Sequence, residues 1–398
     1  MTHSTGRPIL AIPGPSIVPD KVLSAMHRPA PNIYEQDIQD LTDGLVCDLK
    51  RVALTAYHAA IYISNGHGAW EAALANVVAP GDAVLALATG HFGHGWATMA
   101  RTLGADVTVI DFGTQAPVDP DRVETALRAD TTQRIKAVMV THADTSSSIL
   151  SDLPTLRAAI DRAGHPALLL VDCIASFGCD RFEMDNWGVD IAVTASQKGL
   201  MMPPGLGFVF FSERAAKARV ALPRVSPYWD WTLRADPQMF YQYFFGTAPT
   251  HHLFGLRAAL DLILEEGMPA VWARHDVLAR AIWAACSAWS CEGGLRMNLS
   301  NPDQRSRAVT ALSLPAPLGT QLRKWCEIQA GVTLGIGLGM APSDDPAWHG
   351  HFRIGHMGHI NAHSILGVLG AIEAGLSALD IPHGAGALSA AATVIAEG

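Results

Sequence analysis

The sequence has 398 residues, 49% of them hydrophobic and 16% charged, which is enough for one large hydrophobic core and a second, smaller one. A formal net charge of −9 at pH 7 argues against a nucleic acid or an anionic membrane as the partner. Residues 1–8 lack the apolar segment of a signal peptide, and no apolar run is long enough to span a bilayer, so we expect a cytoplasmic protein. No CxxC pair is present, which favours reduced thiols over disulfides or a metal site for Cys47, Cys173, Cys179, Cys286, Cys291 and Cys326.

The chain begins with a proline-rich segment. Residues 9–19 carry prolines on both sides of Gly14, which predicts an extended arm with a tight turn rather than a helix. Because glycine lets a backbone approach a ligand closely, this arm could border a binding site, but a plain connecting loop explains the pattern equally well. The apolar spacing of residues 37–54 then predicts an amphipathic helix.

A glycine turn follows the first apolar strand. Residues 60–64 predict a strand, and residues 69–75 predict a helix. A helix that begins directly after a turn points free backbone N–H groups and the positive end of its dipole at a neighbouring anion. The turn between them, Asn65-Gly66-His67-Gly68, is therefore a candidate phosphate site. Many strand-to-helix turns contain glycine without binding an anion, so the pattern alone leaves both interpretations open.

Strands and helices then alternate, which predicts an α/β fold with a mainly parallel seven-stranded sheet covered by helices on both faces. Besides 60–64, the expected strands are 83–88, 107–111, 135–142, 167–172, 191–196 and 206–211. The expected helices between them are 96–103, 119–128 and 153–163. Ligands of such sheets bind beyond the carboxyl ends of the strands. One edge of the sheet should therefore gather the residues that follow strands, namely Asn65, Phe92, Thr145, Asp172 and Lys198.

Two charged residues lie at the ends of buried strands. Lys198 follows the apolar run 191–194, and Asp172 ends the run 167–172. A lysine at a strand end is most often an ordinary surface residue. If it is partly desolvated, its amine has a lowered pKa and suits Schiff-base formation. A carboxylate near such a lysine is the pair that pyridoxal phosphate (PLP) requires, because the acid keeps the pyridine nitrogen protonated and the lysine holds the aldehyde.

The alternation ends after Ser212, and an aromatic, irregular stretch leads to an apolar helix at 252–266. Beyond this helix the pattern predicts a smaller α+β domain with a strand at 309–314 and a last helix within 385–398. The expected division is an N-terminal arm (1–20), a large PLP-binding domain (21–264) and a small C-terminal domain (265–398).

Five segments together resemble the class V aminotransferases of fold type I, in the alanine/serine–glyoxylate aminotransferase branch. The resemblance covers nearly the whole chain, from about residue 9 to about residue 376. It is carried by Pro13-Gly14-Pro15, Trp70-Glu71-Ala72-Ala73-Leu74, Gly164-His165-Pro166-Ala167-Leu168-Leu169-Leu170-Val171-Asp172, Ser196-Gln197-Lys198-Gly199-Leu200-Met201 and Phe352-Arg353-Ile354-Gly355-His356. It implies the PLP-transferase fold, PLP as cofactor, and transfer of an amino group between a small amino acid (alanine, serine or similar) and a 2-oxo acid (glyoxylate or pyruvate).

The resemblance also implies roles for single residues. Lys198 would form the Schiff base with PLP, Asp172 would bind the pyridine nitrogen, and Arg353 would bind the substrate carboxylate through its planar fork. Gly14 and Tyr34 would border the substrate. In the family, a threonine from one subunit reaches the phosphate bound to the other, so a homodimer with shared sites is expected. The other cofactor contacts would come from Asn65, Gly66, His67, Phe92, Thr145, Ile174, Gln197 and that threonine, here Thr247.

The chain departs from the family pattern in several places. Asn65 replaces the usual serine, Phe244 replaces a tyrosine that contacts phosphate, and residues 33–36 replace an arm segment that borders the substrate. Two other enzyme activities therefore remain open. One is a transamination of the pyridoxamine–pyruvate type, whose enzymes share the segment Arg-Ile-Gly-His-Met-Gly, and the other is a PLP-dependent lyase. A non-catalytic protein of the PLP fold is a further alternative, against which the intact lysine, aspartate and arginine argue.

Overall fold

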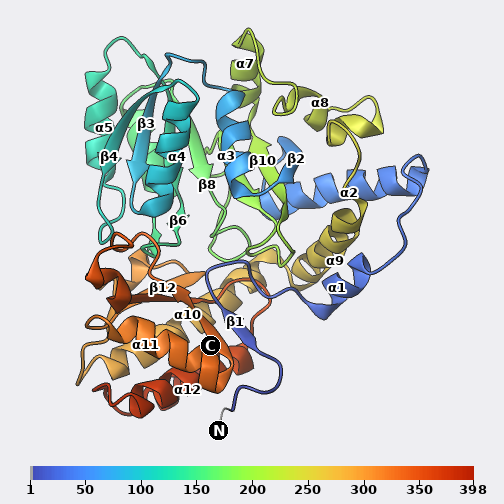
Figure 1. The fold of residues 1–398 in the computed structure, drawn as a ribbon. Helices are drawn as coiled ribbons and strands as arrows, with labels where there is room; N and C mark the ends of the chain where they lie inside the picture. The colour runs from blue at the N-terminus through green and yellow to red at the C-terminus, as the bar shows by residue number, and fades with distance from the viewer. Residues whose placement is uncertain (1–2) are drawn as a thin grey trace.

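The computed structural model describes residues 3–398 and contains two main sheets (Figure 1). The larger sheet has seven strands, ordered from one edge to the other as β2 (His58–Ser64), β10 (Gly205–Phe211), β9 (Ile191–Ala195), β8 (Leu168–Asp172), β5 (Ile135–Thr141), β3 (Ala83–Ala88) and β4 (Asp106–Asp111). Neighbouring strands are parallel except at β10, which is antiparallel to both β2 and β9. The predicted mainly parallel seven-stranded sheet is confirmed.

Helices cover both faces of the larger sheet. One face carries α3 (Gly66–Ala75) and α4 (His91–Thr102), and the other carries α2 (Gln36–Ala53), α5 (Pro120–Ala129), α6 (Leu153–Arg162) and α9 (Thr250–Glu266). In β8, Leu168 and Leu170 join the core under α3 and α4, whereas Leu169 and Val171 join the core on the opposite face. A strand buried on both faces is apolar throughout and can carry a polar residue only at its end, which is where Asp172 lies.

Several shorter elements complete this part of the chain. They are α1 (Asp20–Met26), α7 (Glu213–Ala221), α8 (Thr232–Ala235), the short hairpin of β6 (Ala143–Asp144) and β7 (Ile149–Leu150), and the 3-10 turn η1 (Phe240–Tyr243).

The second sheet has five strands and lies beyond the carboxyl ends of the parallel strands of the larger sheet (Figure 1). Its order is β1 (Ile9–Ala11), β13 (Val332–Ile336), β14 (His351–Gly355), β12 (Val309–Ser313) and β11 (Arg296–Met297). The helices that pack with it are α10 (Met268–Trp289), α11 (Leu318–Trp325), α12 (Ala362–Ala378) and α13 (Ala387–Glu397). Short turns complete it: η2 (Pro302–Gln304), the π-helical η3 (Cys326–Ala330) and η4 (Pro346–Gly350).

The N-terminal arm is part of this second sheet. Its strand β1 pairs in parallel with β13, with Ile9 opposite Val332. The core of the larger sheet, in turn, extends into the first turn of α10, where it includes Met268 and Val271. The arm therefore packs on its own chain, and the domain limits at residues 20 and 264 stay a prediction.

The start of helix α4 differs from the prediction, which placed it at residue 96. The helix begins at His91, and its N-cap residue Gly90 has no side chain to bind the first N–H groups. Asp144 takes this role from a distant part of the chain, because its Oδ2 accepts the N–H groups of Phe92 at 3.0 Å and of Gly93 at 3.2 Å. A cap that lies about fifty residues away leaves no local signal in the sequence.

The cysteines behave as predicted. All six are free, and Cys173, Cys179, Cys286 and Cys326 are buried. Burial raises the pKa of the Cys173 thiol well above its ordinary value and those of the other three buried thiols to about 12. Such thiols are structural rather than reactive. Within residues 3–398, no helix combines the length and the apolar composition that crossing a membrane would need.

We predict that Gly355→Ala will loosen the arm. A Cβ on Gly355 would overlap with the carbonyl group of Ile12, which crosses the end of β14. Overpacking of this kind costs about 1–3 kcal/mol of stability. Denaturant unfolding would measure this loss of stability, and hydrogen exchange of the Ile9 amide, which donates to the Gly331 carbonyl at 2.9 Å, would report on the arm. Gly370→Ala in α12, where a Cβ meets nothing within 4 Å, is the matched control. It should leave the exchange of the Ile9 amide unchanged and should not lower the stability, because alanine favours a helix interior. Equal stability of the two variants would show that the arm does not lie against Gly355.

Candidate active site between the two sheets

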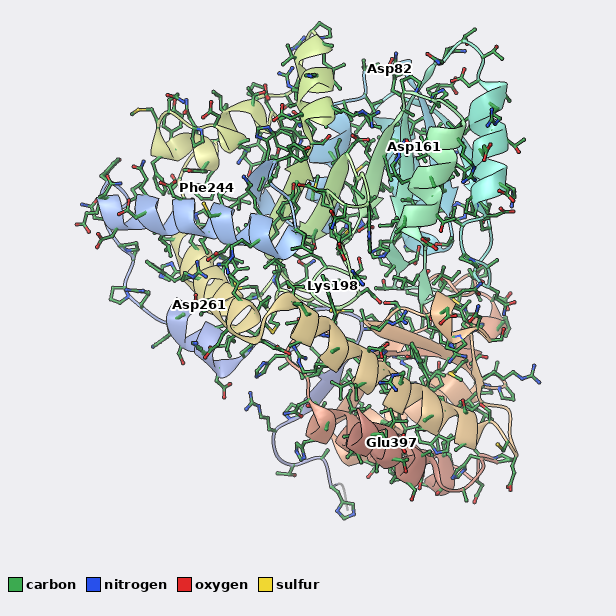
Figure 2. The ribbon with its side chains drawn as sticks, turned by 180° about the vertical axis from the view of Figure 1, so that it is seen from behind. Asp82, Asp161, Lys198, Phe244, Asp261 and Glu397 are labelled. Carbon is green, nitrogen blue, oxygen red and sulfur yellow. The ribbon has the colours of Figure 1, made fainter. Side chains whose placement is uncertain are left out.

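Lys198 lies near the centre of the molecule, between the two sheets (Figure 2). It follows β9, and its amine donates a hydrogen bond to the carbonyl of Pro13 in the arm. The arm is also held to this loop by Ser16, whose Oγ donates to the Lys198 carbonyl at 2.7 Å and whose N–H donates to the Gln197 carbonyl at 2.9 Å. Part of the lysine side chain is accessible, but its amine is surrounded by protein. Burial, and then the positive charge of Arg353, lower the pKa of Lys198 to about 8.

Asp172 ends the neighbouring strand β8 and is buried. Its Oδ1 accepts the N–H of Ile174 at 2.8 Å. Burial raises the pKa of Asp172 to about 7, and the bond from Ile174 opposes this rise. The indole N–H of Trp70 is close enough to lower the pKa as well, although it falls outside the geometry of a hydrogen bond. Because this pKa lies near neutral pH, a cation placed beside the carboxyl group would lower the pKa and leave the group ionised.

Arg353 reaches the site from the second sheet. It lies on β14, is buried, and donates from Nε to the Ile336 carbonyl at 2.7 Å and from Nη1 to the Thr145 carbonyl at 2.8 Å. Burial lowers the pKa of its guanidinium to about 10, so it stays charged at neutral pH. Among residues 3–398, no hydrogen-bond partner is found for Nη2, which leaves this nitrogen free to meet an anion. The fold thus brings Lys198, Asp172, Arg353 and Thr145 to one place, and their roles toward a cofactor or substrate stay predictions.

Residue 14 has to be glycine because the Lys198 side chain lies directly against its backbone. Its φ is +93°, and a Cβ there would overlap with the Nζ, Cδ and Cε atoms of Lys198. The arm therefore covers the lysine closely, and only glycine permits this approach.

Asp144 is a site residue for which the sequence interpretation assigned no role. It is fully buried, and its Oδ1 accepts the N–H of Ser146 at 2.9 Å and the hydroxyl of Ser146 at 2.6 Å. Its Oδ2 holds the first turn of α4, which positions Phe92. The Phe92 ring packs edge to face on Trp70, with 6.3 Å between the ring centroids. An aspartate two residues before a serine is a typical turn signal, but the link to α4 cannot be read from it.

The predicted phosphate turn is already capped. Asn65 Oδ1 accepts the N–H groups of His67 at 3.0 Å and of Gly68 at 3.4 Å. A phosphate at this helix terminus must share these donors with Asn65 or displace its side chain. Gly66 packs on Ile174, since a Cβ would lie 2.5 Å from Ile174 Cδ1. The turn and Ile174 therefore adjoin each other, as the predicted set of cofactor contacts requires.

Tyr34 and Thr247 are not brought to Lys198 within one chain. Tyr34 lies in the loop between α1 and α2, in blue at the right of Figure 1, and is 92% exposed. Thr247 is exposed as well. The two segments adjoin each other instead, around a surface hollow of about 300 Å³ that Tyr34, Gly246 and Ala248 help to line. A role of Tyr34 in binding substrate within its own chain therefore finds no support.

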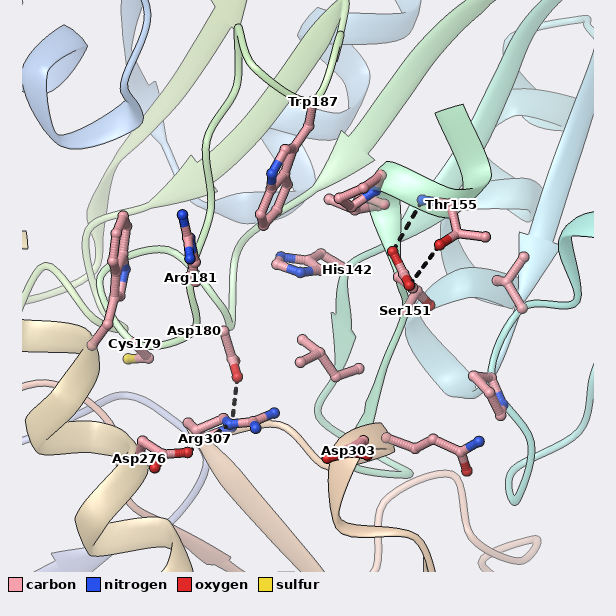
Figure 3. A pocket seen from close by; sticks show the side chains of 18 of the residues that line it. His142, Ser151, Thr155, Cys179, Asp180, Arg181, Trp187, Asp276, Asp303 and Arg307 are labelled. Atoms are coloured by element: carbon pink, nitrogen blue, oxygen red, sulfur yellow. Dashed lines mark hydrogen bonds and ion pairs between the residues drawn. The ribbon is translucent and has the colours of Figure 1, made fainter. Parts of the chain in front are cut away.

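A larger cavity, of about 1000 Å³, lies behind the site (Figure 3). It is lined by loops and helices next to both sheets, with residues such as His142, Asp180, Trp187 and Arg307, and by neither Lys198, Asp172 nor Arg353. Cys179 also lines it, and the Sγ atom would lie 3.0 Å from a Cβ on Gly199, so the cavity and the lysine share a wall. Volume alone would place the reaction in this cavity. The low-pKa amine, the carboxyl and the guanidinium place it at Lys198 instead.

Known proteins provide an independent comparison. The sequence matches the family described as aminotransferase class V over residues 48–343. It is 38% identical over 384 residues to serine–glyoxylate aminotransferase of Methylorubrum extorquens, covering 94% of this chain and 92% of that protein. It is 34% identical over 388 residues to L-aspartate–glyoxylate aminotransferase of Paracoccus denitrificans, with coverages of 96% and 94%.

Solved structures agree with the sequence comparison. Pyridoxamine-pyruvate aminotransferase from Mesorhizobium loti matches with a TM-score of 0.88 at 27% identity over 100% of both chains. Ureidoglycine-glyoxylate aminotransferase from Bacillus subtilis matches with a TM-score of 0.87 at 26% identity over 98% of each chain. A buried lysine, aspartate and arginine at the edge of an α/β sheet, together with these matches, show that the chain belongs to the class V aminotransferase family.

Proposed function

We propose that this aminotransferase uses PLP to move an amino group between a small amino acid, such as alanine or serine, and a 2-oxo acid such as glyoxylate or pyruvate. The observation that carries this proposal is one buried site that holds a low-pKa amine, a carboxyl group and a guanidinium. The names of the relatives from Methylorubrum and Paracoccus support glyoxylate as the acceptor. We also propose a cytoplasmic location, which the six free thiols support.

The residues of the site fit PLP. Two buried polar groups, the side-chain amide oxygen of Gln197 and the indole N–H of Trp70, have no hydrogen-bond partner among the residues described. The Gln197 amide can turn so that its NH₂ group donates to a ligand, whereas the Trp70 N–H lies close to Asp172. Asp172 would hold the pyridine nitrogen, and Phe92 would offer a flat ring to the cofactor. The phosphate would lie at the start of α3, against Asn65, Gly66, His67 and Gln197, with Thr145 and Ile174 beside the ring. When bound, PLP supplies an aldehyde that joins to amines and a ring that takes up electrons from the substrate.

Lys198 would move the proton. An amine with a pKa of about 8 is partly neutral near physiological pH, so Nζ can accept a proton from the substrate carbon and return it to a neighbouring atom. Asp172, with its pKa near 7, would ionise fully beside a protonated ring nitrogen and stabilise that proton. Arg353 would orient the substrate by its carboxylate through the free Nη2. The arm around Gly14 lies over the amine and limits its contact with water.

A transamination of the pyridoxamine–pyruvate type is the second candidate. The match to the Mesorhizobium loti enzyme over the whole chain favours it, as does the capped phosphate turn, where Asn65 already uses two N–H groups. The two candidates differ in the cofactor that stays bound during turnover. Incubation with alanine and added pyridoxal would distinguish them, because the second candidate should release pyridoxamine and pyruvate in equal amounts. The first candidate should instead form glycine and pyruvate from alanine and glyoxylate and keep its cofactor bound. A lyase would instead form products without consuming an oxo acid.

We predict that Lys198→Ala will abolish transamination, since no other amine lies at this position. Borohydride reduction of the PLP-treated wild type, followed by peptide mass analysis, should attach a pyridoxyl group to Lys198. The variant should gain no such group while still binding PLP reversibly. Lys217→Ala, a lysine on α7 away from this site, should be labelled like the wild type. Labelling of another lysine in an active Lys198→Ala protein would exclude this residue.

Arg353→Ala should lower the activity selectively toward substrates that carry a carboxylate. Loss of a charge-assisted contact costs about 2–4 kcal/mol, and this loss should appear in kcat/KM for alanine. An amine without a carboxylate, such as 1-phenylethylamine, lacks the contact and should be affected much less. If both substrates lose the same factor, Arg353 serves the structure through its bonds to Ile336 and Thr145 rather than the substrate.

We further propose that two subunits share each site. Tyr34, Met239, Tyr241 and Phe245 expose apolar surface around the hollow beside Thr247, and a two-fold dimer would cover it. Phe244 is buried in the core and carries no hydroxyl, so Thr247 is the side-chain donor that this loop can offer to a partner's phosphate. The arm, which packs on its own chain, gives no support to the dimer.

Thr247→Val should therefore weaken PLP retention by about 1 kcal/mol, the scale of one hydrogen bond to a charged group. The rate of PLP release from the variant, and the mass in solution with and without PLP, would test this. Thr125→Val, which changes an exposed threonine on α5, is the control. A fully active monomer, or a Thr247→Val protein that releases PLP like the control, would contradict the shared site.

A further inference from the structure

Asp180 joins the two sheets at the wall of the large cavity (Figure 3). It is 1% exposed and lies in the loop that follows β8. Its Oδ1 accepts the backbone N–H of Arg307 at 2.6 Å, and its Oδ2 accepts the hydroxyl of Ser306 at 2.8 Å. Both donors belong to the segment that enters β12 of the second sheet. A buried carboxylate that accepts two such bonds holds its partners firmly, because breaking them leaves polar groups buried without a partner.

The connection continues from Arg307 toward Arg353 through His356. The ring of His356 contacts the Arg307 carbonyl through Nδ1 at 2.9 Å and the Thr310 hydroxyl through Nε2 at 2.9 Å. The indole N–H of Trp283 can only donate, and it donates to Thr310 Oγ1 at 3.1 Å. Nδ1 must carry a proton to donate to the carbonyl, so Nε2 accepts from Thr310. A neutral His356 therefore completes all three of these hydrogen bonds. Burial keeps the ring neutral, because it lowers the pKa of His356 to about 4.

His356 lies three residues after Arg353, and its backbone N–H donates to the Ala308 carbonyl at 2.9 Å. β12 and β14 are paired with Ala311 opposite Arg353. A shift of segment 306–308 would therefore move the strand that carries the guanidinium.

On its other side, Asp180 is fixed to the backbone beside Lys198. Its N–H donates to the Ser176 carbonyl at 2.9 Å. The same loop packs on Gly199 so closely that a Cβ there would overlap with the Phe177 carbonyl. The loop therefore cannot move without moving the residue next to the lysine. Asp180 links this fixed loop to the segment that leads to Arg353.

We propose that Asp180 is a positioning residue that sets Arg353 at the correct place opposite Lys198. The cavity explains why a dedicated contact is needed. It borders both Asp180 and Arg307, so on that face the 306–308 segment meets open space. Away from the cavity, the Ser306 N–H donates to the Ser148 carbonyl at 3.0 Å and Ala308 packs with Cys179, so the Asp180 carboxylate adds the contact on the cavity side. Without the carboxylate, the segment can shift toward this space and carry β14 with it. This proposal rests on the proposed function in one respect, namely that Arg353 binds the carboxylate of the substrate.

The test compares Asp180→Ala with Asp152→Ala, Asp180→Asn and Arg353→Ala. Asp152 lines the same cavity and caps α6 through Thr155, so it matches Asp180 in charge and location without contacting the second sheet. An asparagine at 180 can accept from the Arg307 N–H and donate to the Ser306 hydroxyl, so this variant should retain most of the function. It also keeps the test informative if the alanine variant folds poorly.

Two readouts report on Arg353. The first is pyruvate binding to the protein without added PLP, measured by calorimetry. Asp180→Ala should weaken it about tenfold or more, as displacement of a positioned group by about 1 Å does, and should add nothing in an Arg353→Ala background. The second is the rate at which phenylglyoxal modifies Arg353, followed by peptide mass. Asp180→Ala should raise this rate, and Asp152→Ala should leave it unchanged.

Two results would overturn the proposal. One is an equal loss of pyruvate binding with and without Arg353, which would give Asp180 a general structural role. The other is unchanged modification of Arg353 in Asp180→Ala. If the wild type binds no pyruvate, the role of Arg353 in the proposed function fails, whereas the modification rate still decides whether Asp180 positions that side chain.

Discussion

The desolvation of one amine organises this structure. Lys198 lies where strands, arm and second sheet meet, and its pKa falls to about 8 chiefly because water is removed from around it. Removing water from a charged amine costs free energy. The hydrogen bond to the Pro13 carbonyl in the arm and the nearby charge of Asp172 offset part of this cost. Arg353 acts in the opposite direction and disfavours the charged amine. Together these interactions leave a buried amine whose lowered pKa makes it reactive near neutral pH.

Neither sheet can make this environment alone. The larger sheet places Lys198 and Asp172 at neighbouring strand ends, because β8 and β9 are parallel and adjacent. The second sheet supplies Arg353, which crosses to the Thr145 carbonyl, and the arm supplies the backbone that closes over the amine. The geometry of the site therefore depends on how the sheets are held relative to each other. The polar contacts that span them matter as much as the residues that meet the substrate.

The parts that local sequence determines could be predicted from it. The strand 83–88 has the predicted bounds, since a short apolar run buried on both faces has no other stable arrangement. The positions of Asp172 and Lys198 after such runs predict a PLP site, and the roles of the two residues toward the cofactor stay predictions. The contact of Arg353 with Thr145 spans 208 residues, and no local pattern reports it. The same holds for Asp144, whose carboxylate caps a helix that precedes it by about fifty residues. The roles of Asn65, Phe92, Gln197 and Thr247 toward a cofactor rest on the family resemblance and stay predictions.

The pairing of β1 with β13 has a consequence for the order in which the protein forms. Ile9 is made more than three hundred residues before its partner Val332. Until then β1 has no strand to join, and the arm can be held beside Lys198 only by contacts such as those of Ser16 with residues 197 and 198. The larger sheet, whose strands end at Phe211, can assemble during synthesis well before this point. From the synthesis of Lys198 until that of Val332, more than one hundred residues later, the lysine therefore lacks the complete cover of the arm, and its amine reaches its lowered pKa only when the second sheet folds onto the arm.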